Sequence, residues 1–314
     1  MRAWMLAMAV TLLGIGTLAG VGQGRPVPGA SKCPVFPRSS HWNQRVDRLP
    51  LRPRSGAVIG AVGRSRSAHA DFGSGLYEGR PIGIPFKVVG GGQRRVSVSF
   101  QYASESDRGP YPLPPNVPIE GGPGADGDRH VIVVDRSRCR LFELYAAYPQ
   151  EGGRRWRAGS GAIWSLRSNR LRPRGWTSAD AAGLPILPGL ARYDEVRRGR
   201  IDHALRITVP RTRRAYVYPA RHFASSSNDP SLPAMGQRVR LRRSFDVSRF
   251  PRQSRVILRA LKRYGAIVAD NGSAWYVSGA PSKGWNNDDL HSFGRVKGAD
   301  FEVVDTGRLP RPRR

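Results

Sequence analysis

Glycine and proline recur along this chain at short intervals, which disfavours long helices. The sequence has 314 residues, of which 37 are Gly and 26 are Pro, and both types are spread over its whole length. Glycine weakens a helix interior and proline breaks it, whereas both residues are common in tight turns. Their distribution therefore predicts many turns and short strands.

Strand-like runs fill the spaces between these turn residues. In Arg95–Tyr102, apolar side chains alternate with polar ones, which is the pattern of a half-buried strand. Two runs separated by a few polar residues, Arg129–Asp135 and Arg140–Tyr148, predict a hairpin, and the dipeptide Asn271-Gly272 predicts another because it favours a two-residue turn. The other predicted strands are Gly83–Val89, Gly161–Leu166, His203–Val209, Ala215–Pro219, Arg238–Phe245, Ala266–Asp270 and Ala274–Ser278.

One helix is clearly predicted near the C-terminus. It begins near Pro251 and ends at Gly265, and its apolar residues are spaced to lie on one face: Val256, Ile257, Ala260, Leu261 and Tyr264. A short helix over Ser55–Val62 and a weaker helical turn over Ser178–Ala182 are also predicted. The expected fold class is all-β, mainly an antiparallel β-sandwich or barrel-like domain, with one or two short helices.

The N-terminus has the layout of a secretory signal peptide. Arg2 precedes an unbroken apolar run from Met5 to Ile15, and the small residues of segment 19–22 follow. We therefore predict cleavage near residues 19–24, a secreted, extracellular protein, and no stable membrane insertion after cleavage. The alternative is an uncleaved anchor, but the apolar core is shorter than the roughly 20 residues that span a bilayer.

The rest of the chain divides by composition. We predict a signal peptide over residues 1–24, a Pro- and Arg-rich extended arm over 25–55, a single β-rich domain over 56–308 and a basic tail over 309–314. The two cysteines, Cys33 and Cys139, are expected to form one structural disulfide in an exported protein.

The charge of the chain is strongly positive. The net charge is +29, but of the 52 basic residues only five are Lys, and the Arg residues are scattered apart from a cluster in the tail. This skew resembles codon bias more than selection for a polyanionic partner, although a basic surface can bind one. The expected partner is a polysaccharide or cell-envelope glycan, and no nucleic acid is expected.

Familiar catalytic motifs for zinc, serine-hydrolase and phosphate chemistry do not occur in the sequence. No metal or other cofactor is predicted. An Asn-Asn-Asp-Asp run at 286–289 offers oxygen ligands for calcium, but its spacing is not that of an EF-hand. A capped turn before a short helix at Leu290 is the preferred interpretation.

The predicted hairpin carries the main candidate site. With Arg136-Ser137 as a two-residue turn, His130 faces Glu143, Asp128 faces Tyr145, and all four side chains share one sheet face. Glu120 precedes them in a long proline-rich loop over residues 103–127, and loops of this length are often functional. A three-residue turn would scatter the group, and a surface ion pair is the structural alternative. The opposite face is expected to be core: Val131, Val133, Phe142 and Leu144.

Two further segments supply candidate residues. Carboxylates beside an apolar Pro/Gly stretch are candidate acids or bases: Asp180, Asp194 and Glu195. Side chains expected to bind substrate, with Tyr145, are Trp176, His203, Arg206, Tyr216 and His222. Structural alternatives are a helix-capping role for Asp180 and a buried, hydrogen-bonded His203.

Several stretches resemble a family of exported bacterial proteins for which no activity is established. The resemblance rests on Gly175–Val196, Tyr216–Asp229 and Asp270–Pro281, and on Phe36-Pro37 and Trp42-Asn43 in the arm. It covers most of the mature chain and implies one self-contained domain. It implies no catalytic residue.

We therefore expect an exported carbohydrate-active protein, a glycan hydrolase that uses paired carboxylates. Export, the β-rich pattern and carboxylates interleaved with aromatic residues support this expectation. The alternatives are a lyase acting on an acidic polysaccharide, or a non-catalytic module that binds a glycan or the cell envelope.

Overall fold

The structure, a computed structural model, describes residues 24–311. The predicted signal peptide and the end of the basic tail lie outside these residues. The predicted β-rich class is confirmed, because most regular structure is strand and the helices are few and short. The strands belong to several separate sheets that contain parallel as well as antiparallel pairs, so an antiparallel sandwich or barrel is not confirmed.

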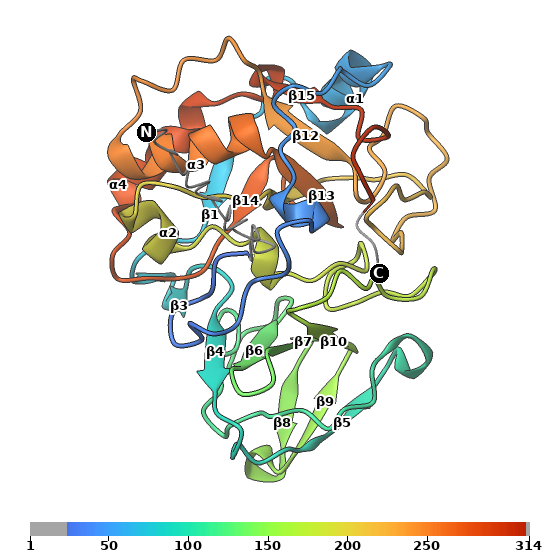
Figure 1. The fold of residues 1–314 in the computed structure, drawn as a ribbon, viewed down its shortest axis with the longest axis vertical. Coiled ribbons are helices and arrows are strands. Elements are labelled where there is room, and N and C mark those ends of the chain that lie inside the picture. Colours follow the sequence, from blue (N-terminus) through green and yellow to red (C-terminus); the bar gives the residue numbers. More distant parts are fainter. Residues whose placement is uncertain (1–23, 312–314) are drawn as a thin grey trace, which may run out of the picture.

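A six-stranded sheet forms the upper part of the molecule in Figure 1. Its strands, in spatial order, are β1 (His69–Asp71), β14 (Tyr276–Ser278), β11 (Leu205–Val209), β13 (Ala266–Asn271), β12 (Arg238–Leu241) and β15 (Phe301–Val303). The two inner strands β11 and β13 run parallel, and both are almost entirely buried.

Two smaller sheets form the lower part of Figure 1. One contains β10 (Ser160–Ser165), β7 (Arg140–Tyr145), β6 (Val131–Asp135) and β4 (Phe86–Val89), and the other contains β5 (Ser97–Phe100), β9 (Arg155–Ala158) and β8 (Tyr148–Gln150). A two-stranded hairpin, β2 (Leu76–Tyr77) and β3 (Arg80–Pro81), lies apart from them.

The four-stranded sheet has a hydrophobic core on each face. Ile132 and Val134 belong to the large core that continues into the six-stranded sheet, whereas Val131 and Val133 belong to a smaller core shared with the three-stranded sheet. Each of these side chains is fully buried, which stabilises the fold by about 1.5–3 kcal/mol per residue. Strand β6 is therefore a central element rather than a half-exposed one.

The longest helix, α3 (Arg252–Arg263), forms as predicted. Its apolar face is buried against the sheet and neighbouring helices, and Pro251 precedes its first turn. Gly265 then turns the chain with φ +67°, where a Cβ would lie 2.2 Å from the Val239 carbonyl oxygen. The other α-helices are α1 (Ser55–Val62), α2 (Tyr193–Arg197) and α4 (Asn287–His291).

Short 3-10 helices occupy several connections: η1 (His41–Asn43), η2 (Ala103–Glu105), η3 (Glu151–Gly153), η4 (Leu187–Gly189), η5 (Ser292–Arg295) and η6 (Gly298–Asp300). The predicted helix over Ser55–Val62 is confirmed, but Ser178–Ala182 is not helical. There the Asp180 amide donates to Ser178 Oγ, so the serine stabilises a local turn instead of a helix.

The predicted hairpin of β6 and β7 is present, with a loop longer than the assumed two residues. Asp135 pairs with Arg140, which leaves four residues in the loop, and Ile132 rather than His130 pairs with Glu143. The Asp135 carboxylate accepts the Ser137 and Arg138 amides and so fixes this longer turn. Because the register moves by two residues, each side chain keeps its predicted face.

The hairpin predicted at Asn271-Gly272 was wrong. Strands β13 and β14 flank Asn271-Gly272 but do not pair, because β11 lies between them. Neither residue has the positive φ that a type I′ turn requires, and the Gly272 amide donates to Val209 at the end of β11. The strands within Gly83–Val89 and Arg95–Tyr102 enter different sheets, and Ala215–Pro219 forms only an isolated bridge at Tyr216.

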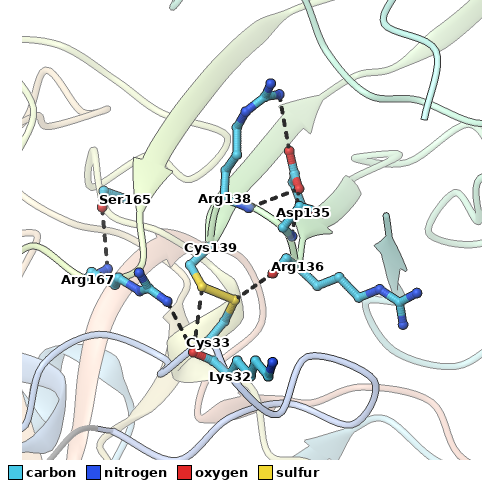
Figure 2. Close-up of a disulfide and its surroundings, with 9 residues drawn as sticks. Lys32, Cys33, Asp135, Arg136, Arg138, Cys139, Ser165 and Arg167 are labelled. Atoms are coloured by element: carbon cyan, nitrogen blue, oxygen red, sulfur yellow. Dashed lines mark hydrogen bonds and ion pairs between the residues drawn. A yellow bond between two sulfur atoms is a disulfide. The ribbon is translucent and has the colours of Figure 1, made fainter. Parts of the chain in front are cut away.

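The predicted disulfide joins Cys33 and Cys139 and ties the N-terminal segment to the end of the β6–β7 loop, as Figure 2 shows. The bridged residues are 106 positions apart, and both are buried. The sulfur atoms lie against the carbonyl oxygens of Arg136 and Lys32.

Among residues 24–311, no helix has the length and apolar character needed to cross a membrane.

We expect that replacing both cysteines, Cys33→Ala and Cys139→Ala, lowers the free energy of unfolding by about 2–4 kcal/mol, because the unfolded chain regains the freedom of a long closed loop. Urea unfolding followed by tryptophan fluorescence measures this loss. Dithiothreitol should destabilise the native protein by a similar amount and leave the double variant unchanged. Equal urea midpoints for oxidised protein and double variant would contradict the prediction.

Candidate functional site

A cleft of about 350 Å³ lies where the six-stranded sheet meets the ends of the smaller sheets. One side is formed by Asp270 and Asn271 at the end of β13, and the other by Tyr145 at the end of β7 and Ser160 at the start of β10. The remaining lining residues come from connecting loops: Tyr102, Glu105, Asp128, Thr177, Ser178, Ala179, Asp180, Ala181, His222 and Ala224. The cleft thus collects groups from distant parts of the chain.

A buried arginine fixes one side of this cleft. Arg206 on β11 donates from Nε and Nη2 to both carboxylate oxygens of Asp180, at 2.9 and 2.8 Å. The same guanidinium donates to Ser278 Oγ at 2.7 Å and to Asp270 at 3.2 Å. Because Arg206 and Asp180 are almost fully buried, each requires the other for charge compensation. Asp180 is thus an ion-pair partner of β11 rather than a helix cap.

His130 bridges two loops behind the cleft. Its Nδ1 lies 2.6 Å from Glu120 Oε2, and its Nε2 lies 2.9 Å from the Ala179 carbonyl oxygen. Both neighbours are acceptors, so the doubly protonated ring satisfies both contacts. Burial alone lowers the pKa of His130, but the charge and hydrogen bond of Glu120, with Asp128, raise it to about 9. His130 in turn holds the pKa of Glu120 below its usual value, although burial opposes this.

Glu143 holds the same loop from the neighbouring strand. Its carboxylate is fully buried and accepts hydrogen bonds from the amides of Ile186 and Leu187 at 2.9–3.0 Å. Burial raises the pKa of Glu143 to about 7, against the effect of these two amides. The alternative of a surface ion pair between His130 and Glu143 is therefore wrong. Both side chains are buried, and they bind separate points of residues 179–187.

Asp270 and Asp128 are two of the four carboxylate residues that line the cleft. Burial and the neighbouring Asp180 raise the pKa of Asp270 to about 7, against the opposing charge of Arg206. Asp128 lines the cleft and is exposed to solvent. Asp71, at the end of β1, stands near this group, and desolvation together with Glu120 and Asp128 raises its pKa. Neither Asp71 nor Asp270 was predicted as a site residue from the sequence, although Asp71 ends β1 and Asp270 is the penultimate residue of β13.

Aromatic and polar side chains complete the cleft. Tyr102 is 47% exposed at its edge, and the Tyr145 ring lies 5.9 Å from the His130 ring. His222 donates from Nδ1 to the Ala181 carbonyl oxygen at 2.8 Å, and its Nε2 lies 3.9 Å from Glu105 Oε2. Since a carbonyl oxygen only accepts, the Nδ1 atom carries the proton. The cleft therefore offers carboxylates, rings and a histidine within one space.

The remaining acidic candidates form a second cluster away from the cleft. Glu195 accepts from His203 Nε2 at 3.0 Å and lies 2.7 Å from Arg192 Nη2. Asp194 lies on the same short helix and pairs with Arg198. Arg192, Glu195 and His203 border a separate cavity of about 310 Å³, and all three are buried. The structure therefore separates the predicted residues Asp194, Glu195 and His203 from the hairpin group.

Other predicted residues lie outside the cleft lining. Trp176 packs beside the Arg172 guanidinium, and Tyr216 stacks near Phe223. The acidic run near the C-terminus is used for helix capping, since Asn286 accepts the Asp289 amide at the start of α4. Among residues 24–311, no group of three or more His, Cys, Asp or Glu side chains is placed to hold a metal ion.

Comparisons with known proteins add no relative. No protein-family model, no curated protein and no solved structure matches this chain.

We expect Arg206→Met to lower the free energy of unfolding by about 3–5 kcal/mol, because it leaves the buried Asp180 carboxylate without its partner. Urea unfolding measures the change. The matched control is Arg259→Met on the exposed face of α3, which should change stability by less than about 0.5 kcal/mol. The double variant Arg206→Met, Asp180→Leu should be more stable than Arg206→Met alone, and equal losses would contradict this account.

We expect the stability to fall by about 1–2 kcal/mol between pH 7.5 and pH 9 because of His130. Its folded pKa of about 9 exceeds the unfolded value of 6.5, so its contribution is complete below pH 6.5 and is lost as the pH rises through 9. Urea unfolding across this range measures the slope. His130→Gln should flatten it, whereas an unchanged slope in this variant would contradict the assignment.

Proposed function

We propose that this protein hydrolyses glycosidic bonds of a polysaccharide in the cleft between β13 and β7. The observation that carries the proposal is the pairing of two carboxyl groups in one cleft: Asp270, whose pKa is raised to about 7, and the exposed Asp128. Hydrolysis of a glycoside requires one protonated acid and one ionised carboxylate beside the scissile bond. Asp270 supplies the acid near neutral pH, and Asp128 is the second carboxyl group in the same cleft.

The proposed step begins with proton donation from Asp270. As the bond between the anomeric carbon and the leaving oxygen breaks, that oxygen takes the Asp270 proton. In one route the anomeric carbon then gains the oxygen of water, whose proton passes to Asp128. In the other route Asp128 bonds to the anomeric carbon first, and water then displaces it while the proton of that water returns to the ionised Asp270. The anomer of the first-formed product, read by NMR, distinguishes these two routes.

The surroundings of the two carboxyl groups support a sugar as substrate. The Tyr102 and Tyr145 rings line the same space, where they can stack on sugar faces, and Ser160, Thr177 and Asn271 provide polar contacts. The predicted signal peptide and the disulfide support action outside the cytosol, where polysaccharides are found. Three positioning residues hold the segment 179–187 in place: His130 and Glu143 bind its backbone, and Arg206 binds the Asp180 side chain.

We expect Asp270→Asn to lower kcat at least 100-fold, because it removes the proton donor. Activity is screened on neutral and acidic polysaccharides by release of reducing ends, with absorbance at 235 nm recorded in parallel. The native enzyme should also lose kcat/KM as the pH rises through about 7, where Asp270 gives up its proton. The variant should lack this alkaline limb.

The matched control is Asp246→Asn, an exposed carboxylate in the turn before α3, which should leave activity unchanged. Thermal unfolding of each variant separates lost activity from lost structure. Products that absorb at 235 nm would replace the hydrolase with a lyase. Glycan binding without any turnover would replace it with a binding module.

A further inference from the structure

A groove of about 550 Å³ lies on the face of the three-stranded sheet, outside the cleft. It runs along β5, β9 and β8, and its lining includes Ser99, Gln101, Tyr148 and Arg157. Alternate residues of β5 and β9 point to solvent on this face, while their neighbours enter the small core. The sheet therefore presents its exposed polar residues on this face.

The groove and the cleft adjoin each other through three chain segments. Gln101, Ala146 and Gly159 line the groove, and the next or preceding residue in each segment lines the cleft: Tyr102, Tyr145 and Ser160. The segments are joined by hydrogen bonds from the Tyr102 amide to Gly159 and from the Gly159 amide to Tyr145. A Cβ on Gly159 would lie 2.6 Å from the Tyr145 ring, so a larger residue does not fit at this position between the groove and the cleft.

The two spaces differ in charge. Four carboxylate residues line the cleft, namely Glu105, Asp128, Asp180 and Asp270, whereas the groove is lined by no acidic residue of the described chain. Its charged group is Arg157, which is exposed and has no carboxylate partner within residues 24–311. The groove thus favours an anionic group at a distance from the reacting bond.

The Arg157 guanidinium is held over an aromatic ring. It lies 5.2 Å from the centre of the Tyr148 ring, and the buried Arg129 lies 4.3 Å from the same ring. Arg129 in turn donates to the backbone carbonyls of Pro123, Ala125 and Ala147, so the ring rests on a fixed support. A cation positioned in this way loses less conformational freedom when it binds a ligand.

We infer that the groove is a binding subsite for an anionic sugar unit, carrying a carboxylate or a sulfate, and that the polysaccharide bound by this protein is acidic. Arg157 donates to the anionic group, and the chain of the glycan continues past Gly159 into the cleft. The location of the reacting bond rests on the proposed function, but binding to the groove does not require turnover. Arg157 is thus a specificity-determining residue.

Binding is measured by calorimetry at low ionic strength on the disulfide-bonded protein carrying Asp270→Asn, so that turnover cannot consume the probe. The anionic probes are hexasaccharides of galacturonate, alginate, hyaluronan and chondroitin sulfate, and the neutral probes are cellohexaose and chitohexaose. Arg157→Gln is compared with Arg155→Gln, which lies on the same exposed face of β9 but outside the groove.

We expect at least one anionic hexasaccharide to bind tenfold or more tightly than the neutral ones, and Arg157→Gln to remove that advantage. Arg155→Gln should leave it intact, and Arg157→Lys should restore part of it. Uronate and sulfate probes reveal which anion is preferred. The inference is overturned if no anionic probe binds, if neutral probes bind equally well, or if Arg157→Gln has no effect. Binding that depends on Arg157 without hydrolysis of any glycan would sink only the proposed function.

Discussion

The position of one side of the cleft depends on the hydrogen bonds of the Arg206 guanidinium. This group comes from β11, binds Asp180 in a connecting loop, and contacts Asp270 on β13 and Ser278 on β14. Its charge is shielded from water, so these partners have to stay in place for the protein to fold. The two carboxylates are not bound equally by Arg206, because Asp180 accepts two hydrogen bonds from it and Asp270 accepts one longer hydrogen bond. Asp270 is therefore close to a cation and still easily protonated.

The hairpin of β6 and β7 performs a complementary task from the other side. Two buried side chains, His130 just before β6 and Glu143 on β7, bind the backbone of residues 179–187 at two points. The loop is therefore held between a guanidinium on one sheet and two ionisable groups on another. Such a support leaves little freedom to the residues that line the cleft, and precise placement of reacting groups requires this kind of rigidity.

The sequence allowed the faces of the hairpin to be predicted, but not its surroundings. Successive side chains along Val131–Val134 and Phe142–Leu144 alternate between two faces of the sheet. A different turn length leaves these faces unchanged when it shifts the register by an even number of residues, as it does here. Burial of both faces depends on sheets formed by residues far away in the chain. Asp71 and Asp270 were missed for the same reason, since only the order of strands in the six-stranded sheet brings their ends to one place. The strong Asn271-Gly272 signal failed because β11 takes the position that a local hairpin would have filled.

The strand order also determines when the chain can acquire its structure. β1 ends at residue 71, but its neighbour β14 begins at residue 276, and β11 lies between two strands that are both more than fifty residues further on. During synthesis, which starts at the N-terminus, most strands of the six-stranded sheet have no pairing partner until nearly the whole chain has been made. Pairings between such distant segments form slowly, and unpaired edges are prone to associate with other chains. A chain of this topology needs to be kept apart from its copies until its last strand has been released.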